Sequence, residues 1–322
     1  MRDKKPLGLP AGFRDIMFEE ARRRRTVETR LAAVFNSKGY GEVSPSTVEF
    51  LELYTRGKQH VRDEAIRFLD RNDQLLALRA DFTPAVARIV GGQLRRSPGP
   101  IKAWYTGDVI RKIDPQREQF SEFGQVGAEI IGVGGREGDI EMIDLAMTCL
   151  EELGIGDVQV HLNHAAIFAG LIDDLSIDRS ALESVKSEID RKDSRGLARR
   201  LADLGVGEHF QHQLEALSRC VGGSEVLGRA KEILQNEMSC NAIDVLVDLD
   251  KALRKWSGHL VYDLTEIDEM EYYTGVMVTF FSPRLTGELG KGGRYDTLLQ
   301  EFGVDAPAVG FSFSMDRLVE LA

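Results

Sequence analysis

Leu264-Thr-Glu-Ile-Asp-Glu-Met-Glu-Tyr-Tyr-Thr-Gly275 is the stretch from which the fold can be predicted. An apolar run over 276–281 and Gly290-Lys-Gly-Gly-Arg-Tyr-Asp296 follow it. The apolar run predicts a strand, and two adjacent tyrosines on a strand point to opposite faces. One tyrosine can then line a pocket while the other packs behind it. Gly292 and Gly293 allow a positive φ or a close approach of the backbone to a ligand.

Composition narrows the class of protein. The chain has 322 residues, of which 43% are hydrophobic, so it is globular and long enough for two or three domains. Its net charge of −11 disfavours tRNA or DNA as the main partner, because proteins that grip nucleic acid usually carry a basic surface. Neither a secretion signal nor an apolar run of roughly 20 residues occurs.

Cysteine usage indicates a reducing compartment. Cys149, Cys220 and Cys240 are widely spaced and form no Cys-x-x-Cys pair, which fits neither a disulfide framework nor a zinc site. We therefore expect a cytoplasmic protein with no metal and no cofactor. His209 and His212 stand three residues apart, but a surface helix explains them more simply than a metal site does.

The N-terminal third alternates helix and strand signals. An apolar face recurs from Asp15 to about Lys38 and predicts a helix that Gly39 ends, with a strand leading to Pro45. Arg22 to Arg25 within this helix are either a solvated face or a phosphate or partner contact. Two short strands between 66 and 78 flank a turn signal, Arg71-Asn-Asp-Gln74.

Polar residues at the next two elements are candidates for a site. Thr83 is expected to cap a helix that runs to about residue 89, and Asp81 can be an acid favoured by the helix dipole. Residues 101–132 alternate strands and a loop. Gln125 and Glu129 lie four apart on the second strand and so share one face, although exposed strand residues could be spaced in the same way.

The chain divides into a core and an insertion. A helix is expected over 137–153 and a strand over 158–161. From about residue 175 to 257 the pattern becomes nearly continuous amphipathic helix, broken at glycines. We interpret 1–174 as the first part of the core, 175–257 as a helical insertion, and 258–322 as the second part of the core.

Taken together, the tyrosine pair before Thr-Gly and the Gly-Gly-Arg-Tyr-Asp motif resemble the histidine-recognition segment of histidyl-tRNA synthetases. Residues 39–45 resemble motif 1 of class II aminoacyl-tRNA synthetases, 101–132 motif 2, and 306–318 motif 3. The resemblance implies an α+β fold with an antiparallel sheet of six or seven strands flanked by helices. It also implies a homodimer through residues near Gly39–Pro45. The chain stops four residues after motif 3, so no anticodon-binding domain is expected.

The same resemblance implies a pocket for free histidine. The matching residues are Asp81, Thr83, Arg111, Gln125, Glu129, Tyr272 and Tyr273. The resemblance implies that Asp81 and Thr83 hold the ammonium group and that Arg111 and Gln125 hold the carboxylate. Glu129 and a tyrosine, here Tyr272, would then contact the imidazole. Either piece of the tyrosine and glycine signature alone could equally be ordinary sheet structure.

The half of the site that would bind ATP departs from the synthetase pattern. Asp268 stands where the synthetases have an arginine, and Ile113, Asp114 and Ser314 also differ. Each charge interaction at about 4 Å is worth on the order of 4 kcal/mol at an intermediate dielectric. One lost transition-state donor typically costs ~10²–10³ in rate. Arg111 and Arg317 are then remnants of an ATP site, and no catalytic residue is expected.

The chain from residue 12 onward most resembles the regulatory subunits of ATP phosphoribosyltransferase. This implies a non-catalytic protein that activates a short-form catalytic subunit and responds to histidine in the first step of histidine biosynthesis. A homodimer within a hetero-oligomer, with a hetero-octamer as the expected assembly, follows from the same resemblance. An enzyme that still adenylates histidine is the alternative, and a tRNA-binding module is a weaker one.

Overall fold

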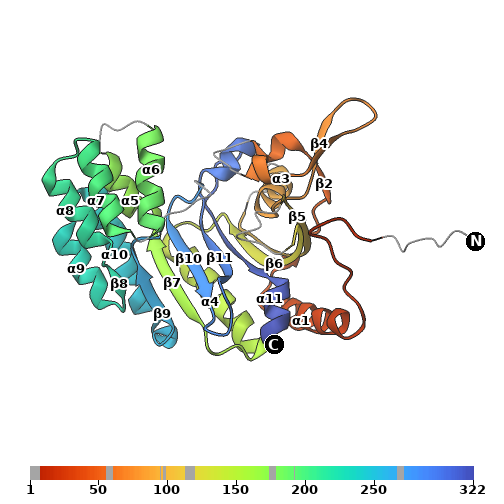
Figure 1. Cartoon of the computed structure of the whole chain (residues 1–322). Coiled ribbons are helices and arrows are strands. Elements are labelled where there is room, and N and C mark those ends of the chain that lie inside the picture. The colour runs from red at the N-terminus through yellow and green to blue at the C-terminus, as the bar shows by residue number, and fades with distance from the viewer. Residues whose placement is uncertain are drawn as a thin grey trace, which may run out of the picture.

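The computed structural model describes residues 8–55, 61–94, 96, 99–112, 120–173, 179–191, 193–266 and 272–322, and its centre is one mixed sheet (Figure 1). The strands lie in the order β1–β5–β6–β12–β11–β10–β7–β9–β8. Their bounds, in that order, are Gly41–Glu42, Ile101–Ile110, Glu122–Ile131, Ala308–Ser314, Glu288–Arg294, Val276–Phe281, Gln159–His164, Leu260–Asp263 and Val221–Gly222.

The six strands from β5 to β7 are antiparallel to one another, as predicted. The expected total of six or seven strands is wrong, because three further strands extend the sheet at its edges. β1 joins β5 in parallel, β9 joins β7 in parallel, and β8 joins β9 antiparallel. β1 and β8 have two residues each, which is too short for an alternating pattern to be recognised.

Three helices cover one face of this sheet: α1 (Phe18–Ser37), α4 (Gly135–Leu153) and α11 (Met315–Leu321). Their apolar sides, including Leu31, Ile143 and Leu318, share one hydrophobic core with the sheet. The predicted helices over 15–38 and 137–153 are confirmed to within three residues at each end. Gly39 follows α1 with a φ of 80°, a left-handed conformation that ends a helix readily at glycine.

Smaller elements cover the other face. They are α3 (Thr83–Leu94), α2 (Val61–Glu64), the 3-10 helices η1 (Leu51–Tyr54) and η3 (Leu298–Phe302), and a three-stranded sheet β2–β4–β3 with bounds Val48–Phe50, Leu75–Leu78 and Arg67–Leu69. The predicted hairpin is confirmed: β3 and β4 are antiparallel. The Asp70 side chain accepts hydrogen bonds from the backbone N–H groups of Asn72 (2.7 Å) and Gln74 (2.9 Å) at its turn.

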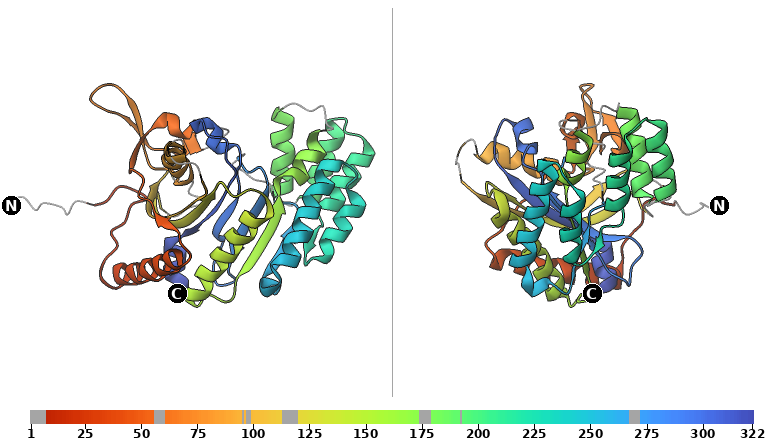
Figure 2. Two further views of the ribbon diagram at one scale, coloured as in Figure 1. Left: turned by 180° about the vertical axis from the view of Figure 1, so that it is seen from behind. Right: turned by 90° about the vertical axis from the view of Figure 1, so that its left-hand side faces the viewer.

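The remaining helices gather beyond β7, at the end of the sheet away from α1 (Figure 2). They are α5 (Ala165–Asp173), α6 (Arg179–Asp190), α7 (Ser194–Asp203), α8 (Glu208–Leu217), α9 (Glu225–Ile233), α10 (Glu237–Ala252) and η2 (Arg254–Trp256). The expected helical character of 175–257 is seen in its described residues, except for β8. Whether this segment is a separate domain stays a prediction, since its buried residues continue the core of the sheet.

Metal ligands and membrane-spanning helices were searched for in the described residues. His209 and His212 are both exposed, and no group of three or more possible metal ligands occurs in the described ranges. Among the helices of those ranges, none combines the length and the apolar character that a membrane crossing requires.

A buried ion pair fastens the sheet to α4. Arg294, on β11, is 6% exposed and donates to the Asp139 carboxylate through Nε at 2.9 Å, to Asp296 at 3.0 Å and to the Gly135 carbonyl at 2.7 Å. A Cβ on Gly275 would lie 2.8 Å from Cδ of Arg294, so only glycine fits at residue 275 beside the arginine side chain. The arginine of Gly-Gly-Arg-Tyr-Asp is therefore a structural residue.

We expect Arg294→Met to lower the free energy of unfolding by about 3–5 kcal/mol, because it leaves the Asp139 carboxylate buried without its partner. Urea unfolding followed by circular dichroism measures the change. Lys231→Met is the matched control: its pair with Asp244 is exposed, so the loss should stay below about 1 kcal/mol. Equal effects of the two substitutions would contradict the structural role of Arg294.

Candidate functional site

The site is organised around the carboxyl group of Glu129, which is 1% exposed. Glu129 lies on β6, and three hydroxyl groups from separate elements donate to it. Thr83 donates to Oε1 at 3.0 Å, Tyr105 to Oε1 at 3.3 Å, and Tyr295 to Oε2. A Cβ on Gly310, the partner of Glu129 on β12, would overlap with Oε2. Glycine at this position lets the carboxyl group cross β12 and reach Tyr295.

Burial changes the protonation of this group. It raises the pKa of Glu129 to about 8, and the negative charge of Asp81 acts in the same direction, while the three hydroxyl groups oppose the shift. Burial also raises the pKa of Asp81, against the positive charges of Arg111 and Lys291 and two backbone N–H groups. Two neighbouring buried carboxyl groups disfavour each other's charge and favour a cationic ligand that donates hydrogen bonds.

The N-terminus of α3 carries the second carboxyl group. Asp81 is 6% exposed, and its Oδ1 accepts from the backbone N–H of Thr83 at 3.4 Å. Its Oδ2 is buried and makes no hydrogen bond within the described residues. The prediction that Thr83 caps α3 is wrong: Thr83 is the first helical residue, and its hydroxyl faces Glu129. Asp81 accepts the N–H instead.

Arg111 and Gln125 border this region from the central strands. Arg111 follows β5; its Nε donates to the Ala80 carbonyl at 2.6 Å, and its guanidinium lies over the Phe123 ring. Gln125 is half-buried on β6. It lies four residues before Glu129 on this strand, so the two side chains share a face, as predicted. Its Oε1 is a second buried acceptor that makes no hydrogen bond within the described part of the chain.

The tyrosine pair precedes β10 and is not part of it. The rings of Tyr272 and Tyr273 are 4.7 Å apart, and both pack on the cluster that contains Tyr105 and Tyr295. The prediction that they point to opposite faces is therefore wrong, since the alternation of a strand does not apply to irregular backbone. A Cβ on Gly293 would lie 2.7 Å from the Tyr273 ring, so the close approach expected of this glycine is made to a side chain.

The residues predicted for the ATP half are only partly described. Asp268, Ile113, Asp114 and the Pro115-Gln116 pair of the motif 2 loop lie outside the described residues. Arg317, on α11, donates from its guanidinium to the Glu288 carbonyl, at the start of β11. Its guanidinium also lies beside Gly287. The structure thus places Arg317 at the hairpin between β10 and β11.

Sequence reasoning missed Tyr105 and Tyr295 as partners of Glu129. Tyr295 is the tyrosine of Gly-Gly-Arg-Tyr-Asp, and alternation from Gly293 would have placed it on the site face. Tyr105 gives no such signal. It faces Glu129 because β5 pairs Ala103 with Glu129, a register that the sequence does not reveal.

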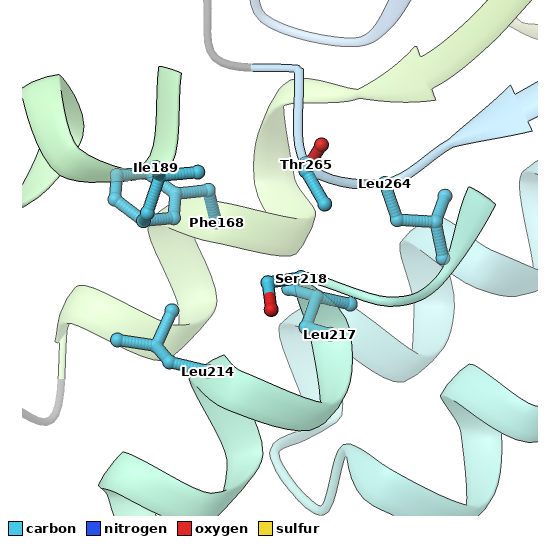
Figure 3. A pocket seen from close by; sticks show the side chains of 7 residues that line it. All are labelled: Phe168, Ile189, Leu214, Leu217, Ser218, Leu264 and Thr265. Carbon is cyan, nitrogen blue, oxygen red and sulfur yellow. The ribbon is translucent and has the colours of Figure 1, made fainter. Parts of the chain in front are cut away.

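A small cavity lies apart from these residues (Figure 3). It is lined by Phe168, Ile189, Leu214, Leu217, Ser218, Leu264 and Thr265, which come from α5, α6, α8 and the end of β9. The lining is apolar apart from two hydroxyl groups and carries no ionisable side chain. It is a gap in helix packing and lacks the carboxyl and guanidinium groups of the region around Glu129.

Comparison with known proteins identifies the family of the chain. The family model for histidyl-tRNA synthetase matches residues 12–318. An ATP phosphoribosyltransferase regulatory subunit of Syntrophotalea carbinolica is 35% identical over 97% of this chain and 74% of its own length. One of Moorella thermoacetica is 34% identical over 99% of this chain and 83% of its own length.

Solved structures show the same fold. A Bacillus halodurans protein described as an ATP phosphoribosyltransferase regulatory subunit/histidyl-tRNA synthetase superposes with a TM-score of 0.90 at 28% identity, covering 99% of this chain and 84% of that one. Histidyl-tRNA synthetase of Nostoc, at 20% identity and a TM-score of 0.82 over 98% of this chain and 75% of that one, supports the fold alone. The chain belongs to the family of ATP phosphoribosyltransferase regulatory subunits, which has the fold of class II, histidyl-type aminoacyl-tRNA synthetases.

Proposed function

We propose that this chain is a non-catalytic regulatory subunit that activates a short-form ATP phosphoribosyltransferase and reports the histidine concentration to it. The observation that carries the proposal is the buried cluster of polar side chains around Glu129, on a chain whose relatives are named as regulatory subunits. Asp268, at the position of a synthetase arginine, supports a role in binding without amino-acid activation.

Histidine fits this pocket group by group. Its ammonium supplies the N–H donors that the Asp81 Oδ2 requires, next to the Thr83 hydroxyl. Glu129 and Tyr272 bind the imidazole, and Arg111 and Gln125 bind the carboxylate. The Tyr273 ring packs against Tyr272. Charge-assisted hydrogen bonds in a preformed pocket explain how a free amino acid binds selectively.

The test is to mix this protein with its short catalytic subunit and titrate histidine. We expect a complex, and a 5- to 150-fold change in phosphoribosyl-ATP synthesis, which is about 1–3 kcal/mol of coupling. Gly310→Ala, which displaces the Glu129 carboxyl group, should abolish the response to histidine. Absence of a complex together with unchanged synthesis would refute the proposal. Histidine-dependent ATP–pyrophosphate exchange would favour the adenylating alternative, for which the presence of Arg111 and Arg317 speaks.

The protonation of Glu129 gives a prediction for the ligand-free protein. Its pKa is raised from 4.5 to about 8 in the fold, so the folded state binds the proton more tightly than the unfolded chain does. The stability that Glu129 contributes is therefore complete below pH 4.5 and is lost as the pH rises through 8.

Glu129→Gln mimics the protonated carboxyl group and does not titrate. Between pH 5 and 8 we expect wild type to lose about 2–4 kcal/mol of unfolding free energy relative to this variant. Urea unfolding across that range measures the difference. Parallel pH profiles for the two proteins would show that Glu129 is ionised throughout.

A homodimer within a hetero-oligomer is also part of the proposal, and an apolar sheet face supports it. On β2 and β3, Val48, Phe50 and Phe68 are 39%, 55% and 40% exposed. Both phenylalanines pair with Leu76 of β4, so their side chains share the outer face of the small sheet. This face directly follows Gly39–Pro45, the segment expected at the dimer interface.

We expect Phe50→Glu to weaken self-association at least about 10-fold, since it places a charge in an apolar contact. Sedimentation velocity over a range of protein concentrations measures this. Met238→Glu on α10, where the side chain is 45% exposed, is the control and should leave the dimer intact. A Phe50→Glu protein that stays as dimeric as the control would exclude this face from the interface.

A further inference from the structure

Arg79 is a buried arginine that joins three segments of the chain. It follows β4 and is 7% exposed. Its guanidinium donates through Nη1 to the Pro45 carbonyl at 2.8 Å, and through Nε and Nη2 to the Asp108 carbonyl at 3.0 and 2.7 Å. Its backbone N–H donates to the Thr47 carbonyl at 2.8 Å, and its own carbonyl accepts from the Ile110 N–H at 2.8 Å. The segment 45–47 is therefore fastened to β5 through one residue.

The surroundings of this cation are almost entirely neutral. Among the described residues, every hydrogen-bond acceptor of the Arg79 guanidinium is a backbone carbonyl. The Asp108 carboxylate pairs with Arg24 instead, at 2.5 Å. Burying a charge without a carboxylate partner costs free energy, so packing alone does not explain an arginine here. The planar guanidinium reaches acceptors on two segments in a fixed geometry, and so holds these segments in one arrangement.

The same guanidinium lies against the aromatic wall of the candidate site. Cζ of Arg79 lies 4.2 Å from the centroid of the Phe82 ring, and this ring stacks on Tyr105 with the two centroids 4.3 Å apart. The Tyr105 hydroxyl in turn donates to Glu129 at 3.3 Å. A Cβ on Gly107 would lie 3.1 Å from both Nη2 of Arg79 and Cζ of Phe82, so glycine leaves room for this stack. Arg79 thus supports the ring that packs behind Tyr105.

A second contact ties the backbone before Asp81 to the small sheet. Tyr54 belongs to η1, directly after β2; it is fully buried, and its hydroxyl accepts from the Ala80 N–H at 3.2 Å. The Ala80 carbonyl accepts from Nε of Arg111 at 2.6 Å. Residue 80 is therefore held by the small sheet on one side and by the site on the other. Asp81 and Thr83 follow it directly, so their positions depend on these contacts.

The other end of this network reaches the proposed dimer face. Ser46, Thr47 and Val48 are exposed and lead into β2, whose Phe50 belongs to the apolar face described above. A partner subunit on that face would fix the backbone that Arg79 contacts. Energetic coupling between two sites can be carried by contiguous hydrogen bonds and packed side chains. The contacts of Arg79 form such a connection.

We propose that Arg79 is a positioning residue that couples histidine binding to homodimer formation. The inference rests on the proposed histidine site and the proposed dimer, and adds an energetic connection between them. In the dimer, the segment 45–47 holds Arg79, and Arg79 holds Phe82 and the backbone of residues 80–83 in the geometry that binds the ligand. Coupling between two binding equilibria is reciprocal, so histidine stabilises the dimer by the factor by which the dimer favours histidine.

The test measures the dimer dissociation constant by sedimentation velocity, with and without saturating histidine. For wild type we expect histidine to lower this constant about 10-fold, which lies within the usual range of coupling factors. Arg79→Lys keeps the charge but loses the planar fork, so histidine should change its dimer dissociation constant less than about 2-fold. Arg284→Lys, which alters a partly exposed salt bridge to Asp157, is the matched control and should keep the full coupling.

Phe82→Leu tests the connection at its other end. It keeps an apolar side chain in the core but removes the ring that contacts Arg79 and Tyr105. We expect it to lower the coupling factor as Arg79→Lys does, while thermal unfolding shows that both variants are folded. A residue with a merely structural role would change stability and leave the ratio of the two dimer dissociation constants as it is in wild type.

The outcomes separate this inference from the proposals on which it rests. Wild type that binds no histidine in calorimetry overturns the proposed site, and wild type that is monomeric at every concentration overturns the proposed dimer. If wild type binds histidine and forms a dimer that histidine does not strengthen, the inference alone is wrong. It is also wrong if Arg79→Lys and Phe82→Leu both keep the coupling factor of wild type.

Discussion

The burial of one carboxyl group, that of Glu129, is the constraint on which the rest of the site depends. An ionisable group removed from water costs several kcal/mol unless it is hydrogen-bonded or protonated. The fold meets this cost with hydroxyl groups from α3, β5 and the residue after β11. Gly310 must lack a side chain for the same reason. Segments that are distant in sequence are thereby fixed around one carboxyl group.

The Glu129 carboxyl group accepts three hydrogen bonds, whereas one oxygen of the Asp81 carboxyl group accepts none within the described residues. The buried Oδ2 of Asp81 and the buried Oε1 of Gln125 are acceptors that make no hydrogen bond within the described residues, which is unusual for a folded protein. Such atoms lower stability in the free state and reward a ligand that donates to them. A bound ammonium group would therefore shift the local equilibrium, and the proposed response to histidine requires such a differential stabilisation.

The sequence predicted the elements better than it predicted their contacts. α1 and α4 are long and amphipathic, so their periodic apolar residues located them to within three residues. The hairpin of β3 and β4 followed from the turn chemistry around Asp70. Strand register, by contrast, is set by packing across the sheet, so neither the contact of the Tyr105 hydroxyl with Glu129 nor the two-residue strands could be predicted. The orientation of Tyr272 was wrong because a strand was assumed where the backbone is irregular.

The Gly-Gly-Arg-Tyr-Asp motif shows why a motif can be present in a protein that does not catalyse adenylation. Successive residues of β11 face opposite sides of the sheet. Arg294 faces α4 and holds Asp139, whereas Tyr295 faces the site and holds Glu129. Gly293 makes room for the Tyr273 ring, and Gly292 passes against the backbone of Gly310. Every position thus has a role in folding or in shaping the pocket, and none of these contacts requires a nucleotide. The presence of the motif is evidence for the fold, and it carries no information about adenylation.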